Sequence, residues 1–161
     1  MTNIMDDRLF RDAMGKFATG ITIVSIKDRE ENIGMTVNAF MSISLDPKLI
    51  AISIDEHASM YDKLNRTEKF GVSILSEEQQ DLSMVFARQK KQDTPINFIE
   101  QDGVPVLEEA LATLSCTVKE KVRAGDHLIY IAEVTDLQLN EGSPILFFEG
   151  QYRTIYHEDK N

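Results

Sequence analysis

Hydrophobic and polar positions follow two different periods along the chain, and each change of period marks a predicted element. Apolar residues recur at helical spacing over residues 7–18. They are Leu9, Phe10, Ala13, Met14, Phe17 and Ala18. β-Branched residues then dominate 21–26, a charged turn covers 27–32, and residues 33–44 have the pattern of one long strand. The pattern therefore predicts an amphipathic helix followed by a β-hairpin.

The middle of the chain combines short strands with two further short helices. Asp46 and Pro47 interrupt the long strand, because proline fixes its own φ and biases the preceding residue away from the α region. The predicted elements that follow are strands over 49–54 and 70–75 and helices over 58–66 and 77–88. Ser76 and Gln79 match a capping box at the start of the last helix. The polar residues 89–105 are predicted to form the longest loop.

The C-terminal third has the two-residue period of half-buried strands. Apolar residues at 114, 116 and 118 alternate with polar ones over 111–122, and Cys116 falls on the inward side. Further strands are predicted over 127–139, 145–148 and 151–156. With about seven strands and no long helix between the late ones, the pattern disfavours parallel βαβ winding. It favours a closed or partly closed antiparallel barrel, because closure removes exposed edges.

Composition limits the class of protein without naming its function. The 161 residues suit one globular domain over 1–161, with 42% hydrophobic and 27% charged residues. Seventeen Lys and Arg against 27 Asp and Glu give a net charge of −10, which repels nucleic-acid backbones and anionic lipids. The single cysteine excludes an internal disulfide, and neither a signal peptide nor an 18-residue apolar stretch is present. We therefore expect a cytoplasmic protein with no nucleic-acid or membrane partner.

Common catalytic and binding motifs are missing from the sequence. Three histidines and one cysteine occur without a G-x-S-x-G motif, which disfavours nucleophilic acyl transfer. No pair of these residues has metal-ligand spacing on one element, so no metal site is expected. Neither familiar phosphate-binding glycine motif is present.

The segment 34–47 carries the most information about binding. Hydroxyl and amide side chains alternate there with apolar ones, so one strand face offers Thr36, Asn38 and Ser42 or Ser44 as hydrogen-bonding groups. Two interpretations stay open on the residues alone: a ligand-binding face, or a half-buried strand whose polar face is wet.

Five segments, in order, resemble the flavin reductase family of the FMN-binding split barrel. They are FRDAMGKFATGITIVS at 10–25, GMTVNAFMSISLDPKLI at 34–50, FGVSILSEEQQDLSMVFA at 70–87, ALATLSCTVKEKVRAGDHLIYIAEV at 110–134 and ILFFEGQYRTI at 145–155. This family includes the small reductase components of two-component flavin monooxygenases. The resemblance implies a mainly β, antiparallel split barrel that forms a homodimer, with FMN or FAD near the dimer interface.

The resemblance also implies where the flavin binds. Thr36, Val37, Asn38 and Ala39 correspond to the segment along the isoalloxazine and ribityl chain, with Ser42 and Ser44 near the same flavin. The family places the phosphate at a turn that here holds His57, Ala58 and Ser59, ahead of a helix whose free N–H groups attract anions. Arg88 is the preferred second phosphate contact, whereas Lys90 and Lys91 fit a solvated helix end. Ala39 and Lys48 depart from the serine and second proline common in the family.

The element Gly125-Asp126-His127 matches the family motif whose histidine lies by the nicotinamide-binding face of the flavin. His127 is thus the candidate catalytic and nicotinamide-binding residue. Tyr152 is a second candidate for this pocket, and a packed strand tyrosine is the competing interpretation.

The function implied is that of an NAD(P)H:flavin oxidoreductase. It would take FMN or FAD, use NADH or NADPH, and supply reduced flavin to a partner monooxygenase. The absence of an Arg-rich site for a 2′-phosphate leans toward NADH. Two alternatives remain on the sequence alone: a bound-FMN electron-transfer protein reduced by another redox protein, and a flavin-free structural or ligand-sensing barrel.

Overall fold

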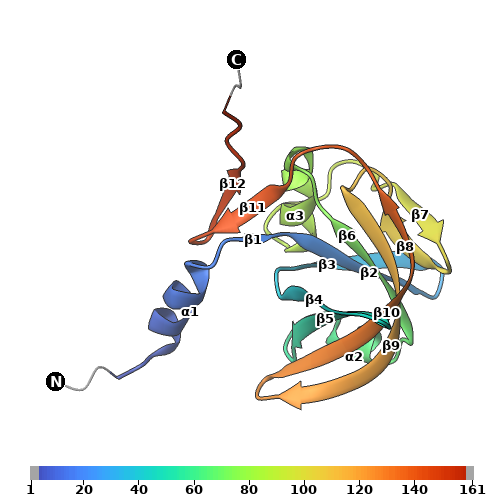
Figure 1. The fold of residues 1–161 in the computed structure, drawn as a ribbon, viewed down its shortest axis with the longest axis horizontal. Coiled ribbons are helices and arrows are strands. Elements are labelled where there is room, and N and C mark those ends of the chain that lie inside the picture. The colour runs from blue at the N-terminus through green and yellow to red at the C-terminus, as the bar shows by residue number, and fades with distance from the viewer. Residues whose placement is uncertain (1–3, 159–161) are drawn as a thin grey trace.

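Seven antiparallel strands form the main sheet of the chain, whose residues 4–158 are described by a computed structural model (Figure 1). In sheet order they are β3 (Glu31–Val37), β2 (Thr22–Asp28), β6 (Lys69–Ile74), β9 (Ala112–Ala124), β10 (His127–Leu139), β5 (Lys48–Asp55) and β4 (Phe40–Leu45). Every pairing in this sheet is antiparallel. The mainly β fold class predicted from the period of the sequence is therefore confirmed.

The two edge strands of this sheet are neighbours in the sequence. Only Asn38 and Ala39 separate β3 from β4. The N–H of Phe40 donates to the Asn38 carbonyl at 2.9 Å, and the N–H of Ser53 on β5 donates to the Ala39 carbonyl at 3.1 Å. Because the first and last strands must meet at this link, the sheet curls into a split barrel. The single strand predicted over 33–44 is wrong, since the chain changes its partner from β2 to β5 here.

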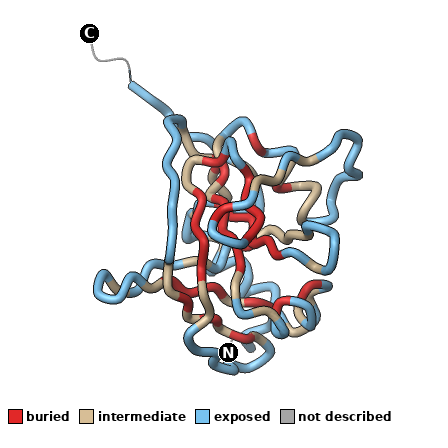
Figure 2. Tube along the Cα trace, turned by 90° about the vertical axis from the view of Figure 1, so that its right-hand side faces the viewer, coloured by how far each residue is buried: buried red, intermediate tan, exposed pale blue. Residues whose placement is uncertain are grey.

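Alternating side chains from the barrel strands fill its interior. Phe70 and Tyr130 are fully buried and pack edge to face with ring centroids 6.3 Å apart. Cys116 is buried on the inward face of β9 as predicted, and this burial raises the pKa of its thiol to about 12. Figure 2 shows the buried residues gathered in the strands at the middle of the molecule.

Smaller elements extend the barrel. A second sheet contains β1 (Thr19–Gly20), β11 (Ile145–Phe148) and β12 (Gln151–Thr154). The helices are α1 (Asp7–Gly15), α2 (Tyr61–Asn65) and α3 (Gln80–Phe86), the last preceded by the 3₁₀ turn η1 (Glu77–Gln79). In Figure 1, α1 and the β11–β12 hairpin project from the same side of the barrel. Among residues 4–158, no helix has the length and apolar character needed to cross a membrane.

The helices are shorter than the sequence pattern predicted. α1 ends at Gly15, although its apolar period continues to Ala18. α2 covers only five of the nine residues predicted, and α3 ends at Phe86. The predicted capping interaction is present in part, because the N–H of Ser76 donates to the Gln79 side-chain oxygen at 2.9 Å.

A hairpin of β7 (Phe98–Gln101) and the fully buried β8 (Val104–Leu107) replaces the second half of the loop predicted over 89–105. Asp102 and Gly103 form its turn, with φ of 47° and 84°, as a two-residue type I′ turn requires. Buried hydroxyls attach β8 to the barrel: Ser25 donates to the Pro105 carbonyl at 2.6 Å, and Ser73 accepts from the Leu107 N–H at 2.9 Å. The Asp-Gly pair between apolar residues was the sequence signal for this hairpin.

The close packing of β8 on the barrel gives a stability test. A Cβ at the buried Gly71 would overlap the Pro105 carbonyl oxygen and lie 2.8 Å from a Val106 methyl group. We expect Gly71→Ala to lower the free energy of unfolding by about 1–3 kcal/mol, because overpacking forces the backbone to shift. Gly20→Ala is the matched control, since nothing lies within 4 Å of a Cβ there. Urea unfolding of both variants measures the difference, and equal midpoints would contradict this account of the packing.

Candidate functional site

An apolar groove of about 900 Å³ runs along the outer face of β4, β5 and β10. Its floor includes Met41, Ala51 and Ile129, and the strand neighbours of Ala51 and Ile129 belong to the barrel core. One wall comes from α1 and the chain after it, through Met14 and Phe17. Phe147, Gly150, Asn38, Ala39 and Thr19 also line the groove, and Arg11 is its one charged residue within the described chain. A flat, largely apolar ligand suits a groove of this size and chemistry.

Two of the predicted flavin residues, Asn38 and Ala39, line this groove. They form the link between β3 and β4, where neither residue belongs to a strand. Both are exposed, and their carbonyl oxygens hold the barrel link closed. Their position leaves the backbone open to a ligand, in agreement with the binding face expected from the sequence.

Thr36 and Tyr152 are joined through helix α3. The Thr36 hydroxyl donates to the Ser83 carbonyl at 2.7 Å, and the Ser83 hydroxyl lies 2.8 Å from the Tyr152 hydroxyl. The Tyr152 ring also packs edge to face on Phe147, with centroids 5.5 Å apart. Val37 is buried in the core, and its carbonyl accepts from the Thr22 hydroxyl at 2.6 Å. These contacts fix β3 against α3, and direct ligand contacts of Thr36, Val37 and Tyr152 remain predictions.

A second, more polar pocket of about 280 Å³ brings together the predicted phosphate residues Ser59 and Arg88. Arg88 follows α3 with a φ of 61°, the left-handed conformation common where helices end. It makes no salt bridge within residues 4–158. Lys63 lines the same pocket but is paired with Asp28 at 3.1 Å. Arg88 is therefore the cation of this pocket that has no ion-pair partner in the described chain.

Lys90, which follows two residues later, does not belong to this pocket. Its ammonium group lies 2.9 Å from Asp81, and this hydrogen bond raises the pKa of Lys90. This pairing with an acidic residue of α3 agrees with the solvated helix end expected for Lys90.

The segment 34–39 connects the groove with the second pocket. Gly34 lines the second pocket, and Asn38 lines the groove. Gly34 lies on β3 and Asn38 directly after it, and four residues of extended chain span about 13 Å. The segment 34–39 therefore contributes residues to both cavities.

His57 and His127 both lie at the end of the β5–β10 strand pair. His127 is the cross-strand partner of Asp55 and lies two residues before Ile129 of the groove floor. The backbone N–H of His57 donates to the Asp55 carboxylate at 2.8 Å, and this bond is the main cause that lowers the pKa of Asp55. His127 Nδ1 lies 2.8 Å from the Asp126 carboxylate. His127 is not among the residues that line the groove. It lies two residues before Ile129 on the same face of β10, with Asp55 opposite it and Asp126 before it.

Several predicted residues line neither cavity. Ser42 and Ser44 lie on β4, opposite Ile50 and Leu49, with a register shift between them. His57 and Ala58 lie before α2 and outside the lining of the second pocket, which takes only Ser59 from the predicted turn. The flavin contacts of these four residues stay predictions.

Sequence reasoning also missed residues that build the groove. The sequence pattern predicts an amphipathic helix where α1 lies, but not that this helix forms a wall of the groove. The apolar side of the helix was the signal that it covers a ligand-binding groove. The floor residues Ala51 and Ile129 were assigned to strands, and only the β5–β10 register brings them together.

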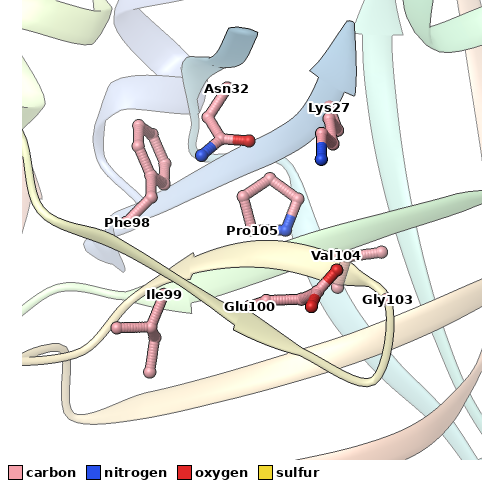
Figure 3. A pocket seen from close by; sticks show the side chains of 8 residues that line it. All are labelled: Lys27, Asn32, Phe98, Ile99, Glu100, Gly103, Val104 and Pro105. Atoms are coloured by element: carbon pink, nitrogen blue, oxygen red, sulfur yellow. The ribbon is translucent and has the colours of Figure 1, made fainter. Parts of the chain in front are cut away.

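A third pocket, of about 270 Å³, lies under the β7–β8 hairpin (Figure 3). Lys27 and Asn32 face Glu100 and Pro105 across it. None of the residues predicted to bind flavin or nicotinamide lines this pocket, so it is separate from the candidate site. Within residues 4–158, no three His, Cys, Asp or Glu side chains are arranged to hold a metal ion.

Known proteins similar to this chain cover nearly its whole length. A family model described as a flavin reductase like domain matches residues 14–156. An NADH-dependent flavin reductase from Rhodococcus sp is 40% identical over 148 residues, which are 90% of this chain and 84% of that protein. The structure of flavin reductase PheA2 in its native state is 49% identical, with a TM-score of 0.92 over 95% of this chain and 100% of PheA2. The styrene monooxygenase flavin reductase SMOB from Pseudomonas putida S12 is 38% identical, with a TM-score of 0.85 over 92% of this chain and 98% of SMOB.

Proposed function

This chain belongs to the flavin reductase family, and we propose that it transfers a hydride from NADH to a flavin held along the segment 34–39. The observation that supports this proposal most is the continuity of that segment. It joins a groove suited to a flat ring with a polar pocket containing Ser59 and Arg88. The similar Rhodococcus protein is named as NADH-dependent, which agrees with the preference for NADH inferred from the sequence.

The residues of the two cavities fit a flavin. Ala39 and Met41 offer small and flexible apolar surface to a flat ring. The Thr19 hydroxyl at the groove is buried and has no hydrogen-bond partner within the described chain, so it can pair with a polar ring atom. Ser59 and Arg88 supply a hydroxyl and an unpaired cation for a phosphate. FMN and FAD both contain the flavin ring and a phosphate, so the residues of the two cavities fit either cofactor.

The contribution of the chain is to hold two flat molecules in contact. A bound flavin accepts a hydride from a nicotinamide and so supplies the redox chemistry. The strands under the groove fix the ring position, and α1 with the β11–β12 turn limits access of water from the side. Fixing two reactants in a productive orientation removes a large part of the entropic barrier. In this proposal His127, which precedes the groove residue Ile129 by two positions on β10, binds the nicotinamide amide, and this step requires no strong general base.

A second copy of the chain completes the groove in this proposal. None of the residues of α1 is buried, and its apolar side chains are exposed: Leu9 by 51%, Phe10 by 53% and Met14 by 56%, followed by Phe17 by 78%. A contiguous apolar surface of this kind is typical of a protein interface. A homodimer that covers it would place the flavin groove at the interface, as the family resemblance implies.

The proposed product, reduced flavin, passes to a monooxygenase. Support comes from the similar protein SMOB, which is named as the flavin reductase of styrene monooxygenase. In this division of labour the present chain supplies reduced flavin, and the reaction with oxygen belongs to the partner.

The proposed activity is tested by crossing NADH and NADPH with FMN and FAD in a steady-state assay of nicotinamide oxidation. We expect NADH to be the better donor with at least one flavin. A protein that binds flavin but oxidises neither nucleotide would instead support the bound-FMN electron carrier. Failure to bind either flavin would leave only the flavin-free barrel.

The phosphate assignment predicts a selective loss of affinity. Arg88→Gln should raise the dissociation constant for FMN about ten- to hundredfold, since a hydrogen bond to a charged group contributes about 1.5–3 kcal/mol. Riboflavin, which has no phosphate, should bind the variant within about twofold of the unchanged protein. Lys91→Gln removes an equal charge outside the pocket and is the control. Fluorescence titration measures all affinities, and an equal loss for riboflavin and FMN would contradict the assignment.

The proposed dimer predicts a change of mass. Phe17→Glu should convert a dimer of 18.3 kDa chains into monomers, because a carboxylate would be buried in an apolar contact. It should also weaken flavin binding, because the groove would lose its cover. Leu139→Glu, at a 74% exposed residue outside the groove, is the control. Light scattering after gel filtration gives the mass, and a monomeric unchanged protein would contradict the dimer.

A further inference from the structure

We propose that Asp126 is a positioning residue for His127: its carboxylate keeps the proton on Nδ1 and leaves Nε2 as the atom offered to the nicotinamide. The direct observation is the distance of 2.8 Å between His127 Nδ1 and Asp126 Oδ1. An ionised carboxylate only accepts hydrogen bonds, so Nδ1 has to be the donor. Nε2 makes no hydrogen bond within residues 4–158. The assignment rests on the nicotinamide role proposed for His127.

The backbone holds Asp126 at the place where this contact is made. Gly125 and Asp126 form the two-residue turn between the paired residues Ala124 and His127. The φ of Gly125 is 60°, which glycine adopts without strain. The Asp126 carbonyl also accepts the N–H of Glu56 at 2.9 Å, which ties the turn to the end of β5. The carboxylate is thus attached to a turn anchored from two sides.

The other charged groups around His127 have partners of their own. Asp55, opposite His127 on β5, accepts hydrogen bonds from the backbone and ring of His57. Glu56 lies 2.6 Å from Arg123 of β9. Asp126 is therefore the carboxylate that contacts the His127 ring, although its side chain is 72% exposed.

The two histidines of this region differ in how firmly they are held. The His57 side chain is 80% exposed, and its Nδ1 lies 3.1 Å from Asp55. The His127 side chain is 39% exposed and makes the shorter contact. With Nδ1 as donor, a neutral His127 presents a lone pair on Nε2, which can accept a hydrogen bond from the amide N–H of a nicotinamide. The opposite tautomer would present an Nε2–H donor, which could pair only with the carbonyl oxygen of that amide.

A double-mutant cycle separates positioning from a general effect of the turn. We expect Asp126→Asn to lower kcat/KM for NADH about fivefold, since an amide can hold either tautomer of the ring and a side-chain hydrogen bond contributes about 1 kcal/mol. Against a background of His127→Ala, the same change should alter kcat/KM by less than about 1.5-fold, because its effect passes through the imidazole. Asp126→Glu should restore part of the loss. Glu120→Gln, a carboxylate on the same hairpin with no histidine contact, is the charge control.

Additive losses in the cycle would overturn the proposal, because Asp126 would then act independently of His127. No loss from Asp126→Asn would overturn it as well, and so would an equal loss from Glu120→Gln. Flavin affinity, measured by fluorescence, should stay unchanged in every variant.

A second measurement on the free protein does not depend on turnover. Nitrogen–proton correlation NMR at pH 8 shows which ring nitrogen carries the proton, and with three histidines the signals can be assigned by single substitutions. We expect the Nδ1–H form for His127 and a mixture of tautomers in Asp126→Asn. An Nε2–H form in the unchanged protein would overturn the proposal even if NADH reduces flavin. Absence of flavin reduction together with an Nδ1–H signal would instead count against the proposed function. Asp126 would then hold the His127 ring without a role in binding the nicotinamide.

Discussion

The change of strand partner at Asn38 and Ala39 is the constraint on which the rest of the structure depends. β3 pairs with β2, and β4 pairs with β5, although only these two residues separate β3 from β4. The edges of a seven-stranded sheet therefore have to meet, and the sheet closes. The same link is exposed, lines the apolar groove and continues to the second pocket through Gly34. The residues that close the barrel thus also present a backbone to the proposed flavin.

The proposed anion site has to act against the charge of the whole chain. A net charge of −10 disfavours the approach of a dinucleotide at long range. Lys63 and Arg88 are the cations that line the pocket, and Lys63 is already paired with Asp28, as Lys90 outside the pocket is with Asp81. Arg88 is the exception in the part of the chain that the structure describes. Affinity for a phosphate would then come from short-range contacts, which salt screens less than it screens the general field.

Much of the fold was predictable because strand periods are local. The alternation along β9 and the turn before His127 set both strands of that hairpin correctly. The break at Asn38 was not predictable from the period, because extended backbone continues through it while only the partner changes. The β7–β8 hairpin was missed although Asp102 and Gly103 carried a turn signal, since polar residues dominated the segment before it.

In the candidate site, too, some features were predictable from the sequence and others were not. Ser59 is a predicted phosphate residue by resemblance and Arg88 by its place in the basic cluster at 88–91, and the structure brings them into one pocket. Ser42 and Ser44 belong to the same resembling segment, 34–50, as Asn38 and Ala39, yet neither serine lines a cavity, and a register shift lies between them on β4. The contacts of His57 with Asp55, and the position of Asp55 opposite His127, depend on the pairing of β5 with β10. Such contacts depend on strand register between distant segments, which a single sequence does not specify.

The most direct measurement of the central claim is anaerobic stopped-flow mixing of the flavin-loaded protein with NADH and with NADH deuterated at nicotinamide C4. If the chain holds both rings in contact for hydride transfer, the oxidised flavin band bleaches within the time of one turnover. Deuterium at the transferred position should then slow the bleaching. Bleaching far slower than turnover, or no bleaching at all, would contradict the claim that this groove is a site of hydride transfer.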